Sequence, residues 1–350
     1  MNFASDNWAG VPDTVTAALA AAAAGPAPAY GGDPLTAAVE ARISALFERP
    51  CRVFFVATGS ASNGLALGAF GRPGGIVLCH RDAHIATDEC GGPEFLTGLK
   101  LAGLAGADGR LAAATVEAAI ARHGADGVHH GRLVALSLTQ ASEIGTVYAP
   151  AEVAALAAVA KARGLAVHMD GARFANAVAS LGVSPAETTW KAGVDVLSFG
   201  LTKVGAWAAE AVVFFDDAPA AEFEYLRKRA GHLFSKSRFV AAQFDALLAD
   251  GLWLSLAGHA NAMAARLAAG LAALPGARLA VTPQANEVFP ILPAATADRL
   301  EAAGARFYPW PAEAFVENRR PDPDERLVRL VTSFRTTEAE VDRFIEICGE

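Results

Sequence analysis

The sequence predicts an α/β protein with a mostly parallel, helix-covered sheet, followed by a smaller α+β domain. Through the first 235 residues, short apolar runs of strand length alternate with longer alanine-rich stretches of helical period. After about residue 236 this alternation gives way to one long helical stretch and a weaker mixture of strands and helices. Alternating strands and helices are typical of a parallel sheet that is covered on both faces.

Six apolar segments are predicted to form strands of this sheet, namely 52–56, 75–79, 133–138, 165–169, 194–199 and 211–215. Residues 62–70 and 150–163 have helical period, and residues 238–274 predict one long helix. The chain has 350 residues, which is enough for two domains. We therefore expect an N-terminal arm (1–12), a large domain (13–235) and a small C-terminal domain (236–350).

The composition bears on location and partners. Hydrophobic residues make up 53% of the chain, yet no uninterrupted apolar run reaches the roughly 18 residues that a spanning helix needs. The first residues lack the basic start and apolar stretch of a signal peptide. A formal net charge of −8 disfavours nucleic acid as a partner, because phosphate contacts need a basic surface. We expect a cytoplasmic protein with neither a membrane nor a nucleic-acid partner.

The cysteines and one histidine are expected to be structural. Cys51, Cys79, Cys90 and Cys348 are scattered without a CxxC pair, which argues against a zinc site and a disulfide framework. No metal is expected for this reason. His168 lies inside the predicted strand 165–169, which favours a packed core residue over a catalytic one.

Lys203 lies in the segment SFGLTKVGA (198–206), directly after a predicted strand and among small and apolar residues. A loop lysine often just reaches solvent, and its own spacing does not separate that role from a functional one. The ends of the other strands are informative, because ligands of an open parallel sheet gather at the carboxyl ends of its strands.

Small polar residues follow the strand 52–56 and lead into a helix, in the stretch Ala-Thr-Gly-Ser-Ala-Ser-Asn-Gly (57–64). Such residues let backbone N–H groups approach an anion at a helix N-terminus. A simple helix cap would use the same residues. The stretch lacks both the P-loop lysine and the GxGxxG spacing, which disfavours a nucleoside triphosphate or a dinucleotide.

Asp170 and Arg173 follow the strand 165–169. They could form a loop salt bridge, but a carboxylate there can also hold a pyridinium nitrogen, and a guanidinium can bind a carboxylate with two hydrogen bonds. An anion cradle, a carboxylate and Lys203 then lie at three strand ends of one sheet. Pyridoxal phosphate needs this set, with the lysine forming a Schiff base to its aldehyde.

Seven longer segments match one known family: FASDNWAG (3–10), AYGGDP (29–34), ATGSASN (57–63), AHIATDECGGPE (83–94), TQASEIGTVY (139–148), HMDGARFANA (168–177) and DVLSFGLTKVGA (195–206). With them the chain resembles the low-specificity L-threonine aldolases, in the β-eliminating-lyase group of fold type I pyridoxal-phosphate enzymes, from residue 3 to residue 330. The resemblance implies a homotetramer, a dimer of dimers with active sites at the subunit interface.

The resemblance also implies roles toward the cofactor. Lys203 is similar to the Schiff-base lysine, Asp170 to the partner of the ring nitrogen and His84 to the imidazole stacked on the ring. The phosphate and the rest of the cofactor would be held by Gly59, Ser60, Arg173 and Lys228. A second phosphate-binding cation aligns poorly and is either Lys236 or Arg238. Asp88 and Glu89, four and five residues after His84, either suit the polarity of a helix or orient that imidazole.

Toward the substrate, Ser5, Arg173 and Arg329 resemble the group that holds the carboxylate, and Tyr30 resembles a tyrosine that reaches the site near a subunit boundary. Many family members carry a histidine near the substrate hydroxyl, where a gapless reading from Gly145 places Glu143. The base at that hydroxyl is therefore Glu143, His84 or a bound water.

The family activity would be cleavage of the Cα–Cβ bond of β-hydroxy-α-amino acids, such as L-threonine or L-allo-threonine, to glycine and acetaldehyde. A phenylserine-type aldolase or a related β-eliminating amino-acid lyase would use the same residues. A module that only stores pyridoxal phosphate would need no carboxylate clamp, and a dinucleotide-binding protein would carry the missing GxGxxG fingerprint.

Overall fold

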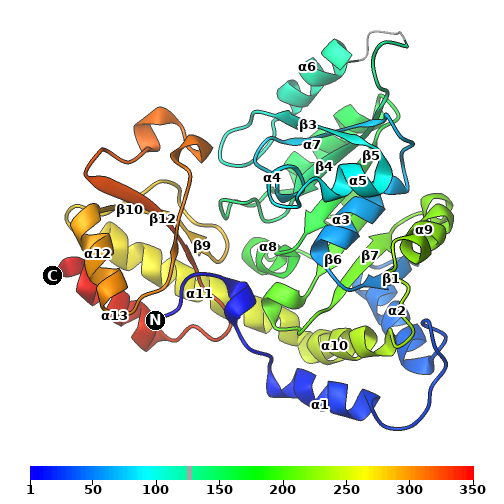
Figure 1. The fold of residues 1–350 in the computed structure, drawn as a ribbon, viewed down its shortest axis with the longest axis horizontal. Helices are drawn as coiled ribbons and strands as arrows, with labels where there is room; N and C mark the ends of the chain where they lie inside the picture. The colour runs from blue at the N-terminus through cyan, green and yellow to red at the C-terminus, as the bar shows by residue number, and fades with distance from the viewer. Residues whose placement is uncertain (124–127) are drawn as a thin grey trace.

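The computed structural model describes residues 1–123 and 128–350 and contains a main sheet of seven strands (Figure 1). In space the strands follow the order β1-β7-β6-β5-β4-β2-β3. Their bounds are β1 (Arg52–Val56), β2 (Ile76–His80), β3 (Lys100–Leu104), β4 (Leu133–Thr139), β5 (Ala166–Gly171), β6 (Val196–Gly200) and β7 (Glu210–Phe214). Strand β7 is antiparallel to both of its neighbours, and the other pairs are parallel. The predicted α/β class with a mostly parallel sheet is confirmed.

All six predicted strands are present, with ends shifted by at most two residues. The strand that the sequence analysis missed is β3, at the edge of the sheet beyond β2. Its residues, Lys-Leu-Ala-Gly-Leu, are only partly buried and include a glycine at position 103. Because neither face of β3 is fully buried, this strand needs no continuous apolar run, and its sequence signal is correspondingly weak.

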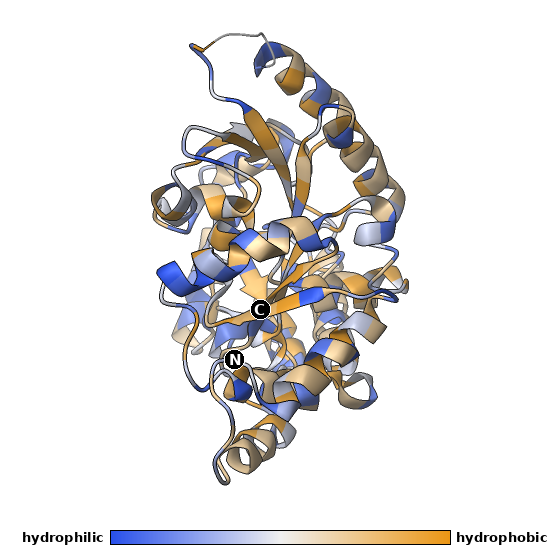
Figure 2. Ribbon diagram, turned by 90° about the vertical axis from the view of Figure 1, so that its right-hand side faces the viewer, coloured by the Kyte–Doolittle hydropathy of each residue, from blue (hydrophilic) through white to orange (hydrophobic). Residues whose placement is uncertain are grey.

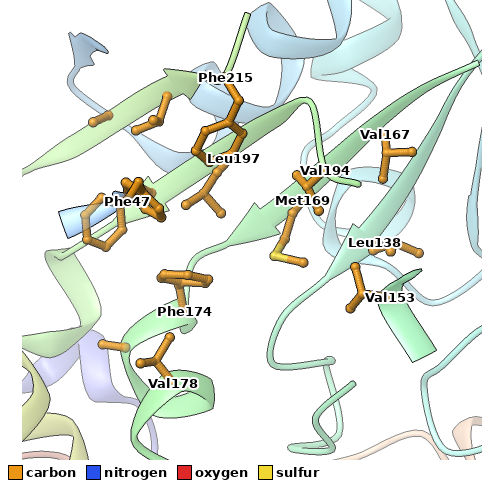
Figure 3. Packing of buried hydrophobic residues seen from close by; sticks show 14 of the residues in the cluster. Phe47, Leu138, Val153, Val167, Met169, Phe174, Val178, Val194, Leu197 and Phe215 are labelled. Carbon is orange, nitrogen blue, oxygen red and sulfur yellow. The ribbon is translucent and has the colours of Figure 1, made fainter. Parts of the chain in front are cut away.

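Helices cover both faces of the main sheet. They are α1 (Asp13–Ala22), α2 (Pro34–Leu46), α3 (Gly59–Gly68), α4 (His84–Thr87), α5 (Gly92–Thr97), α6 (Ala113–His123), α7 (Pro150–Lys161), α8 (Phe174–Leu181), α9 (Asp217–Arg229) and α10 (Arg238–Leu248). Figure 3 shows the core on one face, where Phe47 and Phe174 lie against Leu197 and Met169. On the other face, Phe54, Phe214 and Phe223 pack together. Burial on both faces explains why the strands read as continuous apolar runs.

A second, antiparallel sheet forms the C-terminal part, with strand order β11-β12-β10-β8 and β9 paired to β12. Its elements are α11 (Leu252–Ala272), β8 (Arg278–Leu279), β9 (Glu287–Val288), β10 (Pro290–Pro293), α12 (Ala294–Ala302), β11 (Tyr308–Pro309), β12 (Glu325–Val331) and α13 (Glu338–Gly349). This part has an apolar cluster of its own, which includes Leu292, Leu330 and Phe344.

The N-terminal arm belongs to this second core. The Phe3 side chain is fully buried against Phe344, with ring centroids 5.1 Å apart. Its backbone N–H donates to Arg306 O at 2.8 Å, and its carbonyl accepts from Val331 N at 2.8 Å. The arm is thus anchored on the small sheet immediately before Ser5 and Asp6.

The predicted helix 238–274 is broken in the structure. Asp250 and Gly251 adopt left-handed conformations, with φ of 51° and 70°, and separate α10 from α11. Helix α10 and the start of α11, up to Ala257, pack in the core of the main sheet, whereas α11 from Met263 onward packs in the second core. The boundary predicted between residues 235 and 236 therefore does not coincide with the division between the two cores.

By length and composition, the stretch Arg238–Ala272 is apolar enough to cross a membrane, because it contains an 18-residue window with a mean hydropathy of 1.3. In the fold it lies against both cores, where its apolar side chains contact other side chains. Figure 2 shows the hydropathy of each residue in the fold. The strands are hydrophobic (orange) along most of their length, and the surrounding helices change between hydrophobic and hydrophilic (blue) residues.

Candidate active site

A cavity of about 300 Å³ opens at the edge of the main sheet where the parallel strands end. It is lined by residues at or after the ends of four strands, β1, β2, β5 and β6, among them Gly59, Ser60, His84, Asp170 and Lys203. A second cavity of about 470 Å³ adjoins it, because His84, Glu143 and Lys203 line both. The second cavity adds Ser5, Arg173 and Arg329. The structure thus brings together nine of the predicted site residues.

Lys203 lies in a 3-10 turn, Thr202–Val204, that directly follows β6. Hydrogen bonds from Leu201 N to Ala209 O and from Ala206 N to Leu201 O, both 3.0 Å, hold the turn closed. Gly205 ends it with a φ of 129°, and a Cβ there would lie 3.1 Å from Pro12. Within residues 1–123 and 128–350, Lys203 forms no ion pair. Its amine is therefore available to a ligand in either cavity.

Asp170 is fixed by two hydrogen bonds at the end of β5. Ala172 N donates to its Oδ1 and Asn63 Nδ2 donates to its Oδ2, both at 3.0 Å. The same Asn63 nitrogen donates to Glu89 Oε1 at 2.9 Å. These contacts fix the position of the carboxyl group, which lines the cavity. The sequence analysis did not single out Asn63, whose position on the first turns of α3 carries no recognisable signal.

His84 is oriented by Glu89, with Nδ1 and Oε1 2.9 Å apart. This hydrogen bond raises the pKa of His84, although partial burial opposes it, and the negative charges of Glu143 and Asp170 raise the pKa further. A second ring, His168, is fully buried and lies 2.8 Å from Ser137 Oγ and 3.0 Å from Ser198 Oγ. The predicted core role of His168 is confirmed.

The N-terminus of α3 forms one wall of the cavity. Thr58 caps the helix, its hydroxyl accepting from Ala61 N at 3.2 Å. The following N–H groups, on Gly59 and Ser60, belong to the first turn, where a helix has no internal acceptor for them. Both residues line the cavity. The helix cap therefore accounts for Thr58 alone, and Gly59 and Ser60 remain suited to an anion.

Arg173 is already paired in this structure. Its Nε and Nη2 donate to Asp6 Oδ2 and Oδ1 at 2.8 and 3.1 Å, and Nη1 lies 3.3 Å from Glu287 Oε2. Burial would raise the pKa of Asp6, but the charges of Arg173 and Lys203 and two hydrogen-bond donors hold it below its ordinary range. Burial raises the pKa of Glu287 to about 7, in spite of the nearby positive charge of Arg173. Neither carboxylate was predicted from the sequence as a site residue.

Arg329 differs from Arg173 in its pairing. It projects from β12, with its guanidinium carbon 4.8 Å from the ring centroid of Trp310 and Nη2 3.5 Å from Ala4 O. It forms no ion pair with any residue that the structure describes. Ser5 lines the same cavity, and its hydroxyl accepts from Asn7 N at 3.1 Å. Arg329 is thus the guanidinium best placed to receive an external carboxylate.

Glu143 lies in the loop after β4 and lines both cavities. Burial raises the pKa of its carboxyl above the ordinary value, although the positive charges of Lys203, Arg173 and His84 oppose this. A carboxyl with a raised pKa is a better proton acceptor at neutral pH than an ordinary one. The structure therefore places a candidate base where the sequence analysis expected one.

Glu210 also lines the first cavity, and the sequence analysis did not single it out. Its Oε1 accepts from Thr202 Oγ1 at 2.5 Å, and burial raises its pKa to about 7. The strand ends from which the cofactor site was predicted were those of parallel strands. Because β7 is antiparallel, its first residue lies at that same edge of the sheet. The available signal in the sequence was an acidic residue, Glu210, directly before the apolar run 211–215.

Tyr30 and Lys228 lie together but line neither cavity that contains Lys203. The Lys228 ammonium is 5.6 Å from the centroid of the Tyr30 ring, and Tyr30 lines a separate pocket of about 230 Å³. Lys236 and Arg238 also lie outside the Lys203 cavities, and Arg238 Nε donates to Ala22 O at 3.0 Å.

Comparison with known proteins identifies the family of this chain. The family model for β-eliminating lyases matches residues 2–294. The chain belongs to the β-eliminating lyase family. A low specificity L-threonine aldolase of Pseudomonas aeruginosa is 45% identical over 313 residues, which cover 89% of this chain and 90% of that protein. Another, from Pseudomonas sp., is 44% identical and covers 87% and 88% of the two chains.

The solved structures extend the similarity of this β-eliminating lyase to the whole fold. A threonine aldolase of Leishmania major superposes with a TM-score of 0.91 at 30% identity, covering 99% of this chain and 98% of that one. Mouse CSAD shares the fold alone, with a TM-score of 0.77 at 13% identity over 99% of this chain and 84% of its own. The family and the fold that the sequence predicted are both confirmed.

Proposed function

We propose that this lyase cleaves the Cα–Cβ bond of β-hydroxy-α-amino acids, with L-threonine and L-allo-threonine as substrates and glycine and acetaldehyde as products, and that it uses pyridoxal phosphate. The relatives named as threonine aldolases support the activity. The observation that carries the proposal is that Lys203, Asp170 and the N-terminus of α3 line one cavity.

The donor set fits pyridoxal phosphate. The amine of Lys203 would hold the cofactor covalently, and the Asp170 carboxylate, fixed by Asn63 and Ala172, would accept a hydrogen bond from the ring nitrogen. The N–H groups of Gly59 and Ser60 suit the phosphate. His84 lines the same cavity and would contact the ring. When bound, the cofactor withdraws electrons from the Cα of the attached amino acid.

The substrate carboxylate would bind in the second cavity. Arg329 and Ser5 line it and are open to a ligand, and Arg173, which is also paired with Asp6 and Glu287, is a second guanidinium in its lining. A carboxylate held by two arginines has a fixed orientation, because guanidinium groups bind it in a planar, two-bond arrangement. That orientation decides which bond at Cα breaks.

Glu143 is our candidate for the base that removes the proton from the substrate hydroxyl. Its raised pKa lets it accept a proton near neutral pH, and it lies beside Lys203 in both cavities. His84 is the weaker candidate, since its pairing with Glu89 favours the protonated imidazole, which has no free acceptor.

We further propose a homotetramer in which a second copy of the chain supplies Tyr30 and Lys228 to each site. These two residues lie on one side of the molecule and outside their own Lys203 cavity, and 54% of the Tyr30 surface is exposed. Trp207, on the rim of the cavity, is 70% exposed. Large exposed aromatic residues beside a site are typical of surfaces that contact a partner.

The activity is tested with purified protein and added pyridoxal phosphate. Aldehyde release from L-threonine, L-allo-threonine and phenylserine is followed by coupled reduction with NADH. We expect aldehyde and glycine in equal amounts, and neither from Lys203→Ala. Release of ammonia and a keto acid without aldehyde would instead identify a β-eliminating lyase. Fast turnover of phenylserine with none of either threonine would identify the aryl-specific alternative.

A further inference from the structure

Glu210 is a buried carboxyl that the proposed reaction does not use. It is the first residue of β7 and pairs with Gly200 of β6 and Val56 of β1. Since β7 is antiparallel to both strands, Glu210 lies at the carboxyl edge of the sheet, beside the turn that carries Lys203. Its side chain lines the same cavity as that lysine.

The two carboxyl oxygens of Glu210 have different surroundings. Oε1 accepts from Thr202 Oγ1 at 2.5 Å, and the same hydroxyl accepts from Ala209 N at 3.2 Å. Oε2 lies 2.8 Å from where a Cβ on Gly200 would stand and 3.9 Å from where one on Gly59 would stand. One oxygen is therefore held by the lysine turn, and the other occupies the space between Gly200 and the N-terminus of α3.

Few charges act on this carboxyl. Lys203 favours the ionised form, Asp170 opposes it, and burial opposes it most strongly, so that its pKa rises to about 7. The residues next to it on β1, β6 and α3, namely Val56, Gly200 and Gly59, carry no charge. Glu210 thus gains or loses a proton near neutral pH at little cost.

A phosphate group at the N-terminus of α3 would change this balance. It carries close to two negative charges at neutral pH, and an ionised carboxylate beside it would be repelled in a setting from which water is largely excluded. A protonated carboxyl, in contrast, has an O–H group that can donate to a phosphate oxygen. The Oε2 position, near Gly59, suits such a donor.

We propose that Glu210 takes up a proton from solvent when the cofactor phosphate binds and donates that proton in a hydrogen bond to the phosphate. Binding of the cofactor is then coupled to proton uptake at a carboxyl that also positions the lysine turn through Thr202. The inference rests on the proposed function only in taking pyridoxal phosphate as the cofactor.

The test uses the full-length apoenzyme and 4′-deoxypyridoxine 5′-phosphate, which lacks the aldehyde and leaves Lys203 unreacted. Calorimetric titration in buffers of different ionisation enthalpy, slightly above neutral pH, gives the number of protons taken up. We expect wild type to take up close to one proton more than Glu210→Gln. The matched control is Glu287→Gln, which removes another buried carboxyl of pKa about 7 that lies beside Arg173. It should keep the wild-type proton uptake.

The pH dependence of affinity gives a second readout. Relative to Glu210→Gln, the wild-type affinity for this ligand should fall about tenfold for each pH unit above the Glu210 pKa. Thr202→Val removes a hydrogen bond that favours the ionised form and should move this fall to higher pH, which keeps the test available if Glu210→Gln does not fold. Equal proton uptake and parallel pH profiles in wild type and Glu210→Gln, with binding intact, would overturn the inference about Glu210. They would leave the proposed cofactor unaffected. Absence of binding to folded wild type would remove the proposed cofactor as well.

Discussion

Arg173 and Asp6 form a buried ion pair that joins the N-terminal arm to the end of β5, with two hydrogen bonds of 2.8 and 3.1 Å. Asn286 Nδ2, from the loop before β9, also donates to Asp6 Oδ2 at 3.1 Å. One cluster therefore connects the arm, the large sheet and the small sheet beside the cavity that contains Lys203. The ion pair with Asp6 therefore fixes the position of the Arg173 guanidinium.

Asp6→Asn leaves the buried Arg173 without one of its compensating charges. Removing one partner of a buried pair costs about 3–5 kcal/mol, and we expect this loss in the free energy of unfolding measured with urea. The control is Asp342→Asn, since Asp342 forms a two-bond pair with Arg266 on the surface, where such pairs contribute less than about 1 kcal/mol. Equal losses in the two variants would contradict this account of the junction.

The same pair predicts a dependence of stability on acid. The folded pKa of Asp6 is depressed, so its contribution is fully present above the ordinary pKa of 3.8 and is lost as the pH falls through the lower, folded value. Urea midpoints measured over the acid range should fall more steeply for wild type than for Asp6→Asn.

Reduction with borohydride should attach pyridoxal phosphate permanently to Lys203. We expect a yellow protein whose reduced peptide map carries the cofactor on the peptide that contains Lys203. Lys203→Ala should carry no covalent cofactor after the same treatment. A cofactor found reduced onto another lysine in wild type would show that the assignment of Lys203 is wrong.

Arg329→Leu should lower kcat/KM for L-threonine, because it removes a charge-assisted contact to the substrate carboxylate. The decrease should correspond to a loss of about 2–4 kcal/mol in transition-state stabilisation. The pyridoxal phosphate content should stay normal, since the proposed phosphate site is at α3. Arg326→Leu serves as the control: it lies on the same strand, pairs with the exposed Asp298 and lines neither Lys203 cavity. Loss of cofactor with unchanged turnover per bound cofactor would place Arg329 outside the substrate site.

Glu143→Gln should reduce aldol cleavage about a hundredfold while leaving the cofactor bound, because the amide keeps the shape and loses the basicity. The pKa of Glu143 is raised, and its basic form disappears as the pH falls through that value. The acid limb of the wild-type kcat/KM profile should therefore vanish in the variant. His84→Phe should retain much of the activity. The opposite pattern would make His84 the base, and equal modest losses would point to a bound water.

If two subunits share each site, two inactive variants should complement each other in a mixed oligomer. Lys203→Ala and Lys228→Ala should each be inactive alone, yet random hybrids would contain sites with both lysines intact. Refolding the two variants together should restore about a quarter of the wild-type activity, as expected for two-fold symmetric dimers. No recovery, with hybrids verified by mass, would show that Lys228 does not act on the partner's site.

The sequence predicted much of the site because its residues follow parallel strands. Asp170 lies at the end of β5, the turn of Lys203 follows β6 and the α3 N-terminus follows β1, and topology alone brings such positions together. Long, doubly buried strands such as β5 also leave a clear apolar pattern.

The features that the sequence missed depend on information from elsewhere in the chain. Glu210 is near Lys203 only because β7 runs antiparallel to β6, and the direction of a strand cannot be predicted from its own residues. The pairing of Arg173 with Asp6 and Glu287 joins segments far apart in the sequence. The break at Asp250 replaces one predicted helix with two, because its left-handed conformation interrupts a run whose composition is helical throughout.

Helix α11 ties the unfolding of the two cores together. Trp253, near its start, is buried in the core of the main sheet, and Leu267, further along the same helix, is buried in the second core. A helix forms cooperatively, so unfolding of either core disrupts the helix on which the other core packs. Calorimetry of one isolated chain should accordingly record a single heat-absorption peak rather than two, and a protease should find no long-lived half-folded fragment to cleave.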